Sequence, residues 1–273
     1  DFPNMKSNEY KQFWEDKNCF NIHVIGKDIL RFHAVYWPAM LMAAELPLPK
    51  QIAVHGWWLN DGEKISKSLG NVIDPIALAE EFGIDQLRYF LLREASFGQD
   101  GNFSKKNMII RINSELANNI GNLVQRTLSF LYKQYPQAMP PIDHNLLKGN
   151  PNCKAILDQV MHHLSRYEFN HIILLINSIA HEANAYIDRS APWALSKTDV
   201  ESMNLVIYQL LEYIRIIGIL LQPIVPQSAK KILDQLQIPK EQRNLEFLCN
   251  GNVQLSFSTK PEPIFIKFYS SVV

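Results

Sequence analysis

The chain has 273 residues, 47% hydrophobic and 20% charged, which is usual for a folded protein with a sizeable core. Its 27 basic residues balance 27 acidic ones, so the total charge neither indicates nor excludes a nucleic-acid partner. No segment reaches the roughly 20 continuous apolar residues of a membrane span. The three cysteines are far apart and lack zinc-type spacing. We therefore expect reduced thiols, no membrane partner and no metal site in this segment.

The first part of the chain has the pattern of a parallel α/β sheet. A β-branched run at residues 22–26 is followed by a helical stretch at residues 27–38. A second strand is predicted at residues 51–59, before a polar turn at residues 60–62. Ligands of such sheets bind at the carboxyl ends of the strands. The candidate residues near these ends are Gly26, Asp28, His55 and Gly56.

From residue 104 onwards, apolar residues recur at three- and four-residue steps, which predicts helices almost throughout. An earlier helix at residues 77–93 is expected to begin at Asp74 and Pro75, an acidic N-cap followed by proline. Later helices are predicted at residues 155–167, 170–189 and 200–221, with a shorter one after Pro226 and a long loop at residues 133–151. A capping box of Thr198 and Glu201 is expected to open the helix at residues 200–221.

A basic loop, Lys64-Ile65-Ser66-Lys67-Ser68, lies between the polar turn and the first of these helices. Lysine is a compact cation with rotatable donors, which suits contact with phosphate oxygens. Exposed lysine and serine loops are also common as solvated surface. The pentapeptide alone leaves both interpretations open.

In its setting between a strand and a capped helix, the loop resembles the KMSKS motif of class I aminoacyl-tRNA synthetases, with Ile65 in place of methionine. The resemblance implies that the loop closes over ATP, which magnesium accompanies. Lys67 first, and Lys64 second, would stabilise phosphate charge while the amino-acid carboxylate attacks the α-phosphorus. It also implies ATP binding near Gly26, His55 and Gly56. Asp28 would accept from ribose hydroxyls, although an N-capping Asp28 is the alternative.

Residues 23–38 resemble the methionyl-tRNA synthetase family more than its leucyl, isoleucyl, valyl or cysteinyl relatives. His33 and Trp37 lie four residues apart and share one helix face. The resemblance implies that they line a methionine pocket, because aromatic walls make favourable contacts with a thioether. Core packing is the alternative for aromatic residues at helical spacing, and it is our prediction for Phe32 and Tyr36.

Residues 104–135 hold five basic side chains and one acidic one, which predicts a basic helix within a neutral chain. Asn118, Asn122 and Arg126 share one helix face and could contact an unstacked base together, although a solvated polar face has the same pattern. Residues 119–126 and 191–193 resemble the anticodon-reading elements of methionyl-tRNA synthetases. The resemblance implies that Asn122 and Arg126 read base edges and that Trp193 stacks on a base. A buried Trp193 that anchors a helix end is the alternative.

The resemblance implies an α/β plus all-α fold. Residues 1–103 would form the second half of a Rossmann-type catalytic domain, residues 104–240 a helical anticodon-binding domain, and residues 241–273 a tail packed on the body. The expected reaction activates methionine with ATP and transfers it to tRNA-Met, in the cytoplasm or the mitochondrial matrix. A His-x-Gly-His signature is missing, so we expect this segment alone to be inactive. There are two alternatives. The chain could be a tRNA-binding module without catalytic activity, or part of a related class I synthetase for another apolar amino acid.

Overall fold

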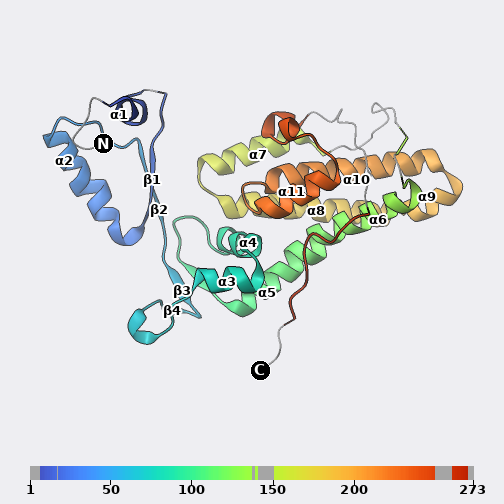
Figure 1. Cartoon of the computed structure of the whole chain (residues 1–273), viewed down its shortest axis with the longest axis horizontal. Helices are drawn as coiled ribbons and strands as arrows, with labels where there is room; N and C mark the ends of the chain where they lie inside the picture. The colour runs from blue at the N-terminus through green and yellow to red at the C-terminus, as the bar shows by residue number, and fades with distance from the viewer. Residues whose placement is uncertain (1–6, 17, 137–138, 141–150, 250–259, 270–273) are drawn as a thin grey trace. The chain divides into compact units, whose positions relative to one another are not determined.

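The computed structural model shows a chain of two compact units. It describes residues 7–16, 18–136, 139–140, 151–249 and 260–269. Unit 1 consists of residues 1–71 and 95–102, and unit 2 of residues 72–94 and 103–273. Unit 1 holds the parallel strands and unit 2 is almost entirely helical (Figure 1). The predicted combination of an α/β part with an all-α bundle is confirmed.

Unit 1 is built on two parallel strands. β1 (Ile22–Gly26) pairs with β2 (Gln51–His55), with Gly26 opposite His55. The crossover between them runs through η2 (Lys27–Ile29), η3 (Phe32–Tyr36) and α2 (Trp37–Ala43), and α1 (Asn8–Tyr10) and η1 (Lys11–Glu15) precede them. This confirms the predicted strand–helix–strand order. Since the strands are parallel and in register, their carboxyl ends lie at the same edge.

The segment predicted as one strand at residues 51–59 is two strands, so that prediction was wrong in its extent. β3 (Trp58–Asn60) forms a hairpin with β4 (Glu63–Lys64) and has β5 (Gly101–Phe103) on its other side. The break falls at Gly56, where a Cβ would lie 2.1 Å from the carbonyl oxygen of Gln99. Only glycine fits so close to another backbone segment, and the chain changes sheet there.

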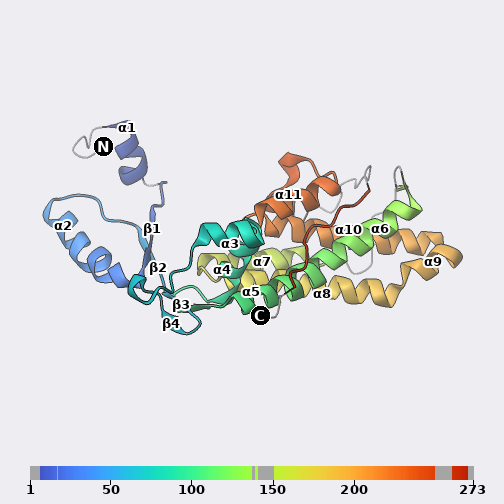
Figure 2. The same cartoon turned by 60° about the horizontal axis from the view of Figure 1, so that its bottom comes forward.

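Unit 2 contains the longer helices. Their bounds are α3 (Pro75–Phe82), α4 (Ile84–Glu94), α5 (Lys105–Arg111), η5 (Ile112–Gly121), α6 (Asn122–Gln134), α7 (Cys153–Ser165), α8 (Phe169–Ser190), α9 (Pro192–Thr198), α10 (Val200–Leu221), α11 (Pro226–Gln235), η7 (Lys240–Gln242) and η8 (Leu245–Phe247). The elements α5, η5 and α6 follow one another without a break, and η5 has wide π-helical turns. Figures 1 and 2 show α8 and α10 side by side, with α7 and α11 packed against them.

Most predicted helices are confirmed, but one predicted helix is divided in two and the cap of another differs from the prediction. Asp74 accepts from the backbone N of Ile76 at 2.8 Å, as an N-cap should. The helix that follows is divided in two at Gly83, whose φ of 93° lies outside the helical region. The N-cap of α10 is Asp199, which accepts from the backbone N of Ser202 at 3.0 Å. Thr198 instead ends α9, so the expected capping box does not form.

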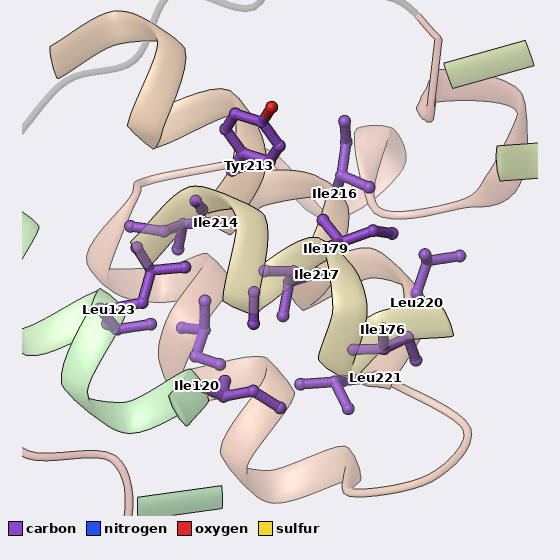
Figure 3. Close-up of a cluster of buried hydrophobic side chains, with 14 of the residues drawn as sticks. Ile120, Leu123, Ile176, Ile179, Tyr213, Ile214, Ile216, Ile217, Leu220 and Leu221 are labelled. Atoms are coloured by element: carbon purple, nitrogen blue, oxygen red, sulfur yellow. The ribbon is translucent and has the colours of Figure 1, made fainter. Parts of the chain in front are cut away.

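The core of unit 2 surrounds α10. By length and composition this helix could cross a membrane, but 89% of its most apolar window is buried inside the bundle. Figure 3 shows Ile214 and Ile217 of α10 among side chains from neighbouring helices, including Ile179 of α8 and Leu123 of α6. A helix that is enclosed on all sides is apolar all round, which accounts for its composition.

Two contacts fasten later segments to the bundle. The fully buried Arg215 of α10 pairs with Glu212 at 2.8 Å and donates to the carbonyl oxygens of Phe247 and Leu248. Near the end of the chain, Asn113 of η5 exchanges two hydrogen bonds with the backbone of Phe268. Residues 260–269 of the predicted tail therefore pack on unit 2, while residues 250–259 and 270–273 lie outside the described part.

The domain boundaries predicted from the sequence stay predictions. The compact units divide differently from residue 103, because α3 and α4 belong to unit 2. Arg88 of α4 donates to the carbonyl oxygens of Pro223 and Ile224, which follow α10. A division by contacts need not coincide with one by function.

Candidate functional site

The carboxyl ends of β1 and β2 bring three of the predicted ATP-binding residues together. A Cβ on Gly26 would lie 2.5 Å from Asp28 Oδ1 and 3.6 Å from His55 Cε1. Asp28 therefore places its carboxylate over the backbone of Gly26, beside the imidazole of His55. The N-cap of η2 is Gly26, and no side chain caps this turn, so the contacts do not favour a capping role for Asp28. The edge offers a carboxylate and an imidazole next to an accessible backbone.

A second group of side chains connects this edge to the basic loop. Lys27 Nζ lies 2.5 and 2.7 Å from the two carboxylate oxygens of Asp100, and Oδ1 of Asp100 also accepts from the backbone N of Trp57 at 2.8 Å. The hydrogen bond from Lys27 lowers the pKa of Asp100. The ammonium groups of Lys27 and Lys64 lie 4.2 and 4.9 Å from the centroid of the Trp57 ring. Both cations therefore lie over the same indole ring.

The sequence did not predict roles for Asp100 and Trp57. Asp100 lies 73 residues after its partner Lys27, and no local spacing announces the pair. The close approach of Gly56 to the backbone of Gln99 is the feature that brings Asp100 to the strand ends.

The basic loop is held in one conformation by Asn71. Oδ1 of Asn71 accepts from the backbone N of Ser66 at 2.8 Å, and Nδ2 donates to the carbonyl oxygen of Lys64 at 3.1 Å. Asn60 of β3 in turn donates to the carbonyl oxygen of Asn71 at 2.9 Å. Lys67 begins the short turn η4 (Lys67–Leu69) directly after this brace. The loop is thus tied at both ends to the β3–β4 hairpin.

The predicted methionine-pocket residues lie together in an aromatic cluster. The rings of His33 and Trp37 are 6.0 Å apart, edge to face. His23 of β1 lies 4.9 Å from the Trp37 ring, and Trp14 lies 6.1 Å from it. Nε2 of His23 is buried without a hydrogen-bond partner among the described atoms. We had predicted no role for Trp14. Its position in η1 shows that the first helical turns of the described chain contribute to this cluster.

Trp37 also lines an apolar cavity of about 470 Å³ in unit 1. The other lining residues are Glu9, Tyr10, Phe13, Trp14, Leu41, Leu46 and Pro47. His33 is not among them, and its Nδ1 lies 3.0 Å from the carbonyl oxygen of Ile29. The ring centroids of Phe32 and Tyr36 lie 5.7 Å apart, but these side chains are 58% and 40% exposed. The predicted core packing of these two residues was therefore wrong.

In unit 2, a polar groove of about 630 Å³ runs along η5 and α6 on one side and α8 on the other. We call it the asparagine groove. Its lining includes the predicted residues Asn118, Asn122 and Arg126, together with Arg93, Ser114, Glu115, Asn119, Leu174, Asn177, Ser178, His181, Asn184 and Asp188. Asn184 donates to the carbonyl oxygen of Asn119, and Asn119 donates to that of Asn177, both at 3.1 Å. These amides connect the two helical walls.

Glu115 anchors the floor of the asparagine groove. Its Oε2 accepts from the hydroxyl of Tyr89 at 2.7 Å and from Nε of Arg93 at 3.1 Å. Burial, and then the Glu115 carboxylate, raise the pKa of Tyr89, which therefore stays a proton donor. The floor is a fixed set of hydrogen bonds rather than a mobile polar surface.

Arg126 and Trp193 meet at one end of this groove. The Cζ atom of Arg126 lies 5.8 Å from the Trp193 ring centroid, and Nη2 pairs with Oδ1 of Asp188 at 2.7 Å. Trp193 is 45% exposed, so it is not the buried anchor that the alternative required. Ala191, with a left-handed φ of 41°, turns the chain between α8 and α9 and places this indole beside the groove.

The predicted basic helix is largely neutralised, which corrects the expectation from the charge count. Lys105 pairs with Glu81 at 2.7 Å, and Arg111 pairs with Glu94 at 2.6 Å and with Glu115 at 2.8 Å. These acidic partners come from helices α3 and α4 as well as η5, so the sequence of residues 104–135 alone overstated the free positive charge. Hydrogen bonding and stacking, rather than net charge, distinguish this surface.

Known proteins similar to this chain agree on one family. Residues 3–128 match the family model described as class I tRNA synthetases (M), and residues 148–267 match the anticodon-binding domain of methionyl tRNA ligase. The chain is 49% identical to the methionine–tRNA ligase of Rickettsia felis, over 100% of the chain and 54% of that protein. It is 44% identical to the same enzyme of Rhizobium meliloti, over 91% and 49%.

Solved structures give the same assignment. Mycobacterium tuberculosis methionyl-tRNA synthetase bound by methionyl-adenylate has a TM-score of 0.86 and 37% identity, covering 97% of this chain and 53% of that one. The free form of the same protein has a TM-score of 0.84 and 35% identity, covering 98% and 53%. The chain spans about half the length of the relatives that it matches. It belongs to the methionyl-tRNA synthetase family of class I aminoacyl-tRNA synthetases.

Proposed function

We propose that the protein containing this chain is a methionine–tRNA ligase, which activates methionine with ATP and transfers it to tRNA-Met. The observation that carries the proposal is the braced basic loop, joined through Trp57, Lys27 and Asp100 to the carboxyl ends of the parallel strands. A loop fixed in this way can present lysine ammonium groups to phosphates without first being ordered. Preorganised charge of this kind is the main source of catalysis in phosphoryl and nucleotidyl transfer.

In this mechanism Lys67 and Lys64 neutralise the charge that develops on the ATP phosphates as the methionine carboxylate attacks the α-phosphorus. Asp28, held over Gly26 beside His55, accepts from the ribose hydroxyls. Gly56 keeps the neighbouring backbone close to the nucleotide. A magnesium ion accompanies the triphosphate, as hard cations prefer phosphate oxygens.

Methionine would be held by the aromatic cluster of His33 and Trp37. An edge-to-face pair of aromatic rings suits a thioether, because sulfur makes favourable contacts at ring edges. The structure of the Mycobacterium tuberculosis relative contains methionyl-adenylate, which supports this substrate for the family. A pocket of this type would discriminate against charged or β-branched side chains.

The asparagine groove would receive the anticodon loop of tRNA-Met. Asn122 and Arg126 offer amide and guanidinium donors to base edges, and the exposed Trp193 ring offers a stacking surface. The neutralised charge of the helix supports readout by shape and hydrogen bonds over general attraction to phosphate. The enzyme would act where translation takes place, in the cytoplasm or the mitochondrial matrix.

Methionine-dependent exchange between ATP and pyrophosphate tests the proposal, in the protein extended to the length of its relatives. We expect exchange with methionine only, and about a hundredfold loss of rate in Lys67→Ala. Lys133→Ala, at the end of α6, is a matched control that removes a lysine from unit 2 and should leave the rate unchanged. A folded protein without exchange for any amino acid would leave only the alternative of a tRNA-binding module. Exchange with another apolar amino acid would identify a related synthetase.

A further inference from the structure

The corner between α7 and α8 gathers metal-binding side chains away from the two sites described above. His162 and His163 occupy the last turn of α7, and Glu168 lies directly before α8. One ligand atom from each of the three lies within 4.8 Å of those of the other two. We propose that His162, His163 and Glu168 bind a divalent transition-metal ion of the Zn²⁺ type. This site differs from our expectation that the segment would hold no metal.

The backbone of the corner holds Glu168 over the end of α7. The backbone N of Glu168 donates to the carbonyl oxygen of His163 at 2.9 Å, and that of Tyr167 donates to the carbonyl oxygen of Leu164 at 3.1 Å. Tyr167 has a φ of 60°, a left-handed conformation that non-glycine residues seldom adopt. The reversal is therefore fixed by main-chain contacts, and the carboxylate returns to the two imidazoles without any metal.

One pair of the candidate ligand atoms already lies close together. Nδ1 of His163 lies 2.7 Å from Oε2 of Glu168, as expected for a hydrogen bond. A metal with bonds of about 2.0–2.2 Å would replace the proton between these atoms and separate them to about 3.3–3.6 Å at tetrahedral angles. His162 is exposed, with its ring 5.3 Å from that of His163, so it can turn towards the metal without disturbing the core.

Two neighbours act on this cluster in opposite ways. His171 of α8 stacks on His163, with ring centroids 5.2 Å apart and planes inclined by 13°, and so fixes the orientation of the His163 imidazole. Arg166 Nε donates to Oε1 of Glu168 at 2.8 Å, which leaves Oε2 directed at His163. The guanidinium charge also opposes a cation. We therefore expect micromolar affinity, much weaker than that of a buried structural zinc site.

The ligand set determines which metal would bind. Two imidazoles and one carboxylate favour Zn²⁺, Ni²⁺ or Co²⁺ over Mg²⁺ and Ca²⁺, which prefer oxygen ligands only. Three protein ligands leave a fourth position for water. The bound ion would connect the end of α7 to the start of α8. Because it binds the folded chain and not the unfolded one, it would stabilise the folded state.

Calorimetric titration of ZnCl₂ into the 273-residue chain, prepared without a polyhistidine tag, tests this site. We expect one saturable Zn²⁺ per chain and a higher unfolding temperature with zinc than with magnesium. His162→Ala and Glu168→Gln should each weaken binding at least tenfold. Two variants serve as controls. His171→Phe keeps the stacking ring without its nitrogens, and His181→Asn removes a histidine elsewhere on α8; both should bind as the parent does.

Two results would overturn the proposal. One is the lack of saturable one-to-one binding, and the other is binding that both His162→Ala and Glu168→Gln leave intact, which would place the ion elsewhere. If Glu168→Gln lowers the unfolding temperature without metal, His162→Ala alone decides, because the His162 side chain is exposed. None of these results depends on aminoacylation, so the site and the proposed function can fail separately.

Discussion

Asn71, which lies after the basic loop in sequence, holds the backbone of that loop in place. Its side chain bonds to Lys64 and to Ser66, so it spans the residue between them and fixes the approach to Lys67. Asn60 holds the backbone of Asn71 against the hairpin. Each bond is an ordinary amide hydrogen bond, and together they limit the conformations from which Lys67 acts.

We expect Asn71→Ala in the full-length protein to lower the rate of methionine-dependent pyrophosphate exchange about tenfold, with a smaller change in KM for ATP, because a looser loop loses transition-state contacts first. Steady-state exchange kinetics measure both constants. Asn71→Asp keeps the acceptor for Ser66 and loses the donor to Lys64, so an intermediate rate is expected. An unchanged rate in Asn71→Ala would show that the brace has no part in the reaction.

Trp193 presents a half-exposed ring at the end of the asparagine groove, next to Arg126. We expect Trp193→Ala to weaken binding of tRNA-Met by about 1–3 kcal/mol, the usual contribution of one base stacked on an aromatic ring. Trp193→Phe keeps a stacking surface and should lose less. Filter binding with tRNA-Met and with an anticodon-altered transcript measures the effect. Equal losses for the two RNAs, or unfolding of the bundle, would argue against stacking on an anticodon base.

At the scale of elements, the start of α10 depends on one carboxylate. Asp199 accepts from the hydroxyl and from the backbone N of Ser202, and these hydrogen bonds lower its pKa. A carboxylate whose pKa is lower in the folded state stabilises the fold above its unfolded pKa of about 3.9, and that stabilisation is lost as the pH falls through the folded pKa.

We therefore expect Asp199→Ala to unfold at a lower temperature than the parent at pH 7, and the difference to shrink as the pH falls below about 4. Calorimetric melting of both proteins between pH 7 and pH 3 gives the comparison. Glu201→Ala, two residues after Asp199, is the control, because the capping box that would have used the Glu201 side chain does not form. A difference that stays constant with pH would mean that the charge of Asp199 is not what stabilises α10.

Local patterns predicted the elements far better than their connections. The apolar periodicity located α7, α8 and α10, and the Asp74–Pro75 pair located the start of α3, because each signal lies within a few neighbouring residues. The division at Gly56 and the pairing of Asp100 with Lys27 depend on segments more than 40 residues apart. No periodicity encodes such contacts.

The candidate sites divide in the same way. Asn122, Arg126 and Trp193 were predicted through resemblance. The structure places Asn122 and Arg126 in the asparagine groove and the Trp193 ring beside Arg126. The opposite wall, with Asn177, Asn184 and Asp188, comes from α8, and no local pattern predicted it. The acidic partners of Lys105 and Arg111 were missed for the same reason, since they lie on other helices.

At the scale of the whole molecule, the two proposed activities reside in separate compact units. Unit 1 carries the strand ends and the basic loop, and unit 2 carries the asparagine groove. Adenylate formation and anticodon recognition should therefore respond to different variants. Changes such as Trp193→Ala should lower transfer to tRNA and leave pyrophosphate exchange intact, while Lys67→Ala should lower both.

Aminoacylation of tRNA-Met by the full-length protein, with a panel of amino acids, is the most direct test. We expect methionine to be attached to tRNA-Met, other amino acids to be rejected, and about a hundredfold loss of rate in Lys67→Ala. A folded full-length protein that attaches no amino acid to tRNA-Met, or attaches another one at the same rate as methionine, would contradict the assignment of a methionine–tRNA ligase.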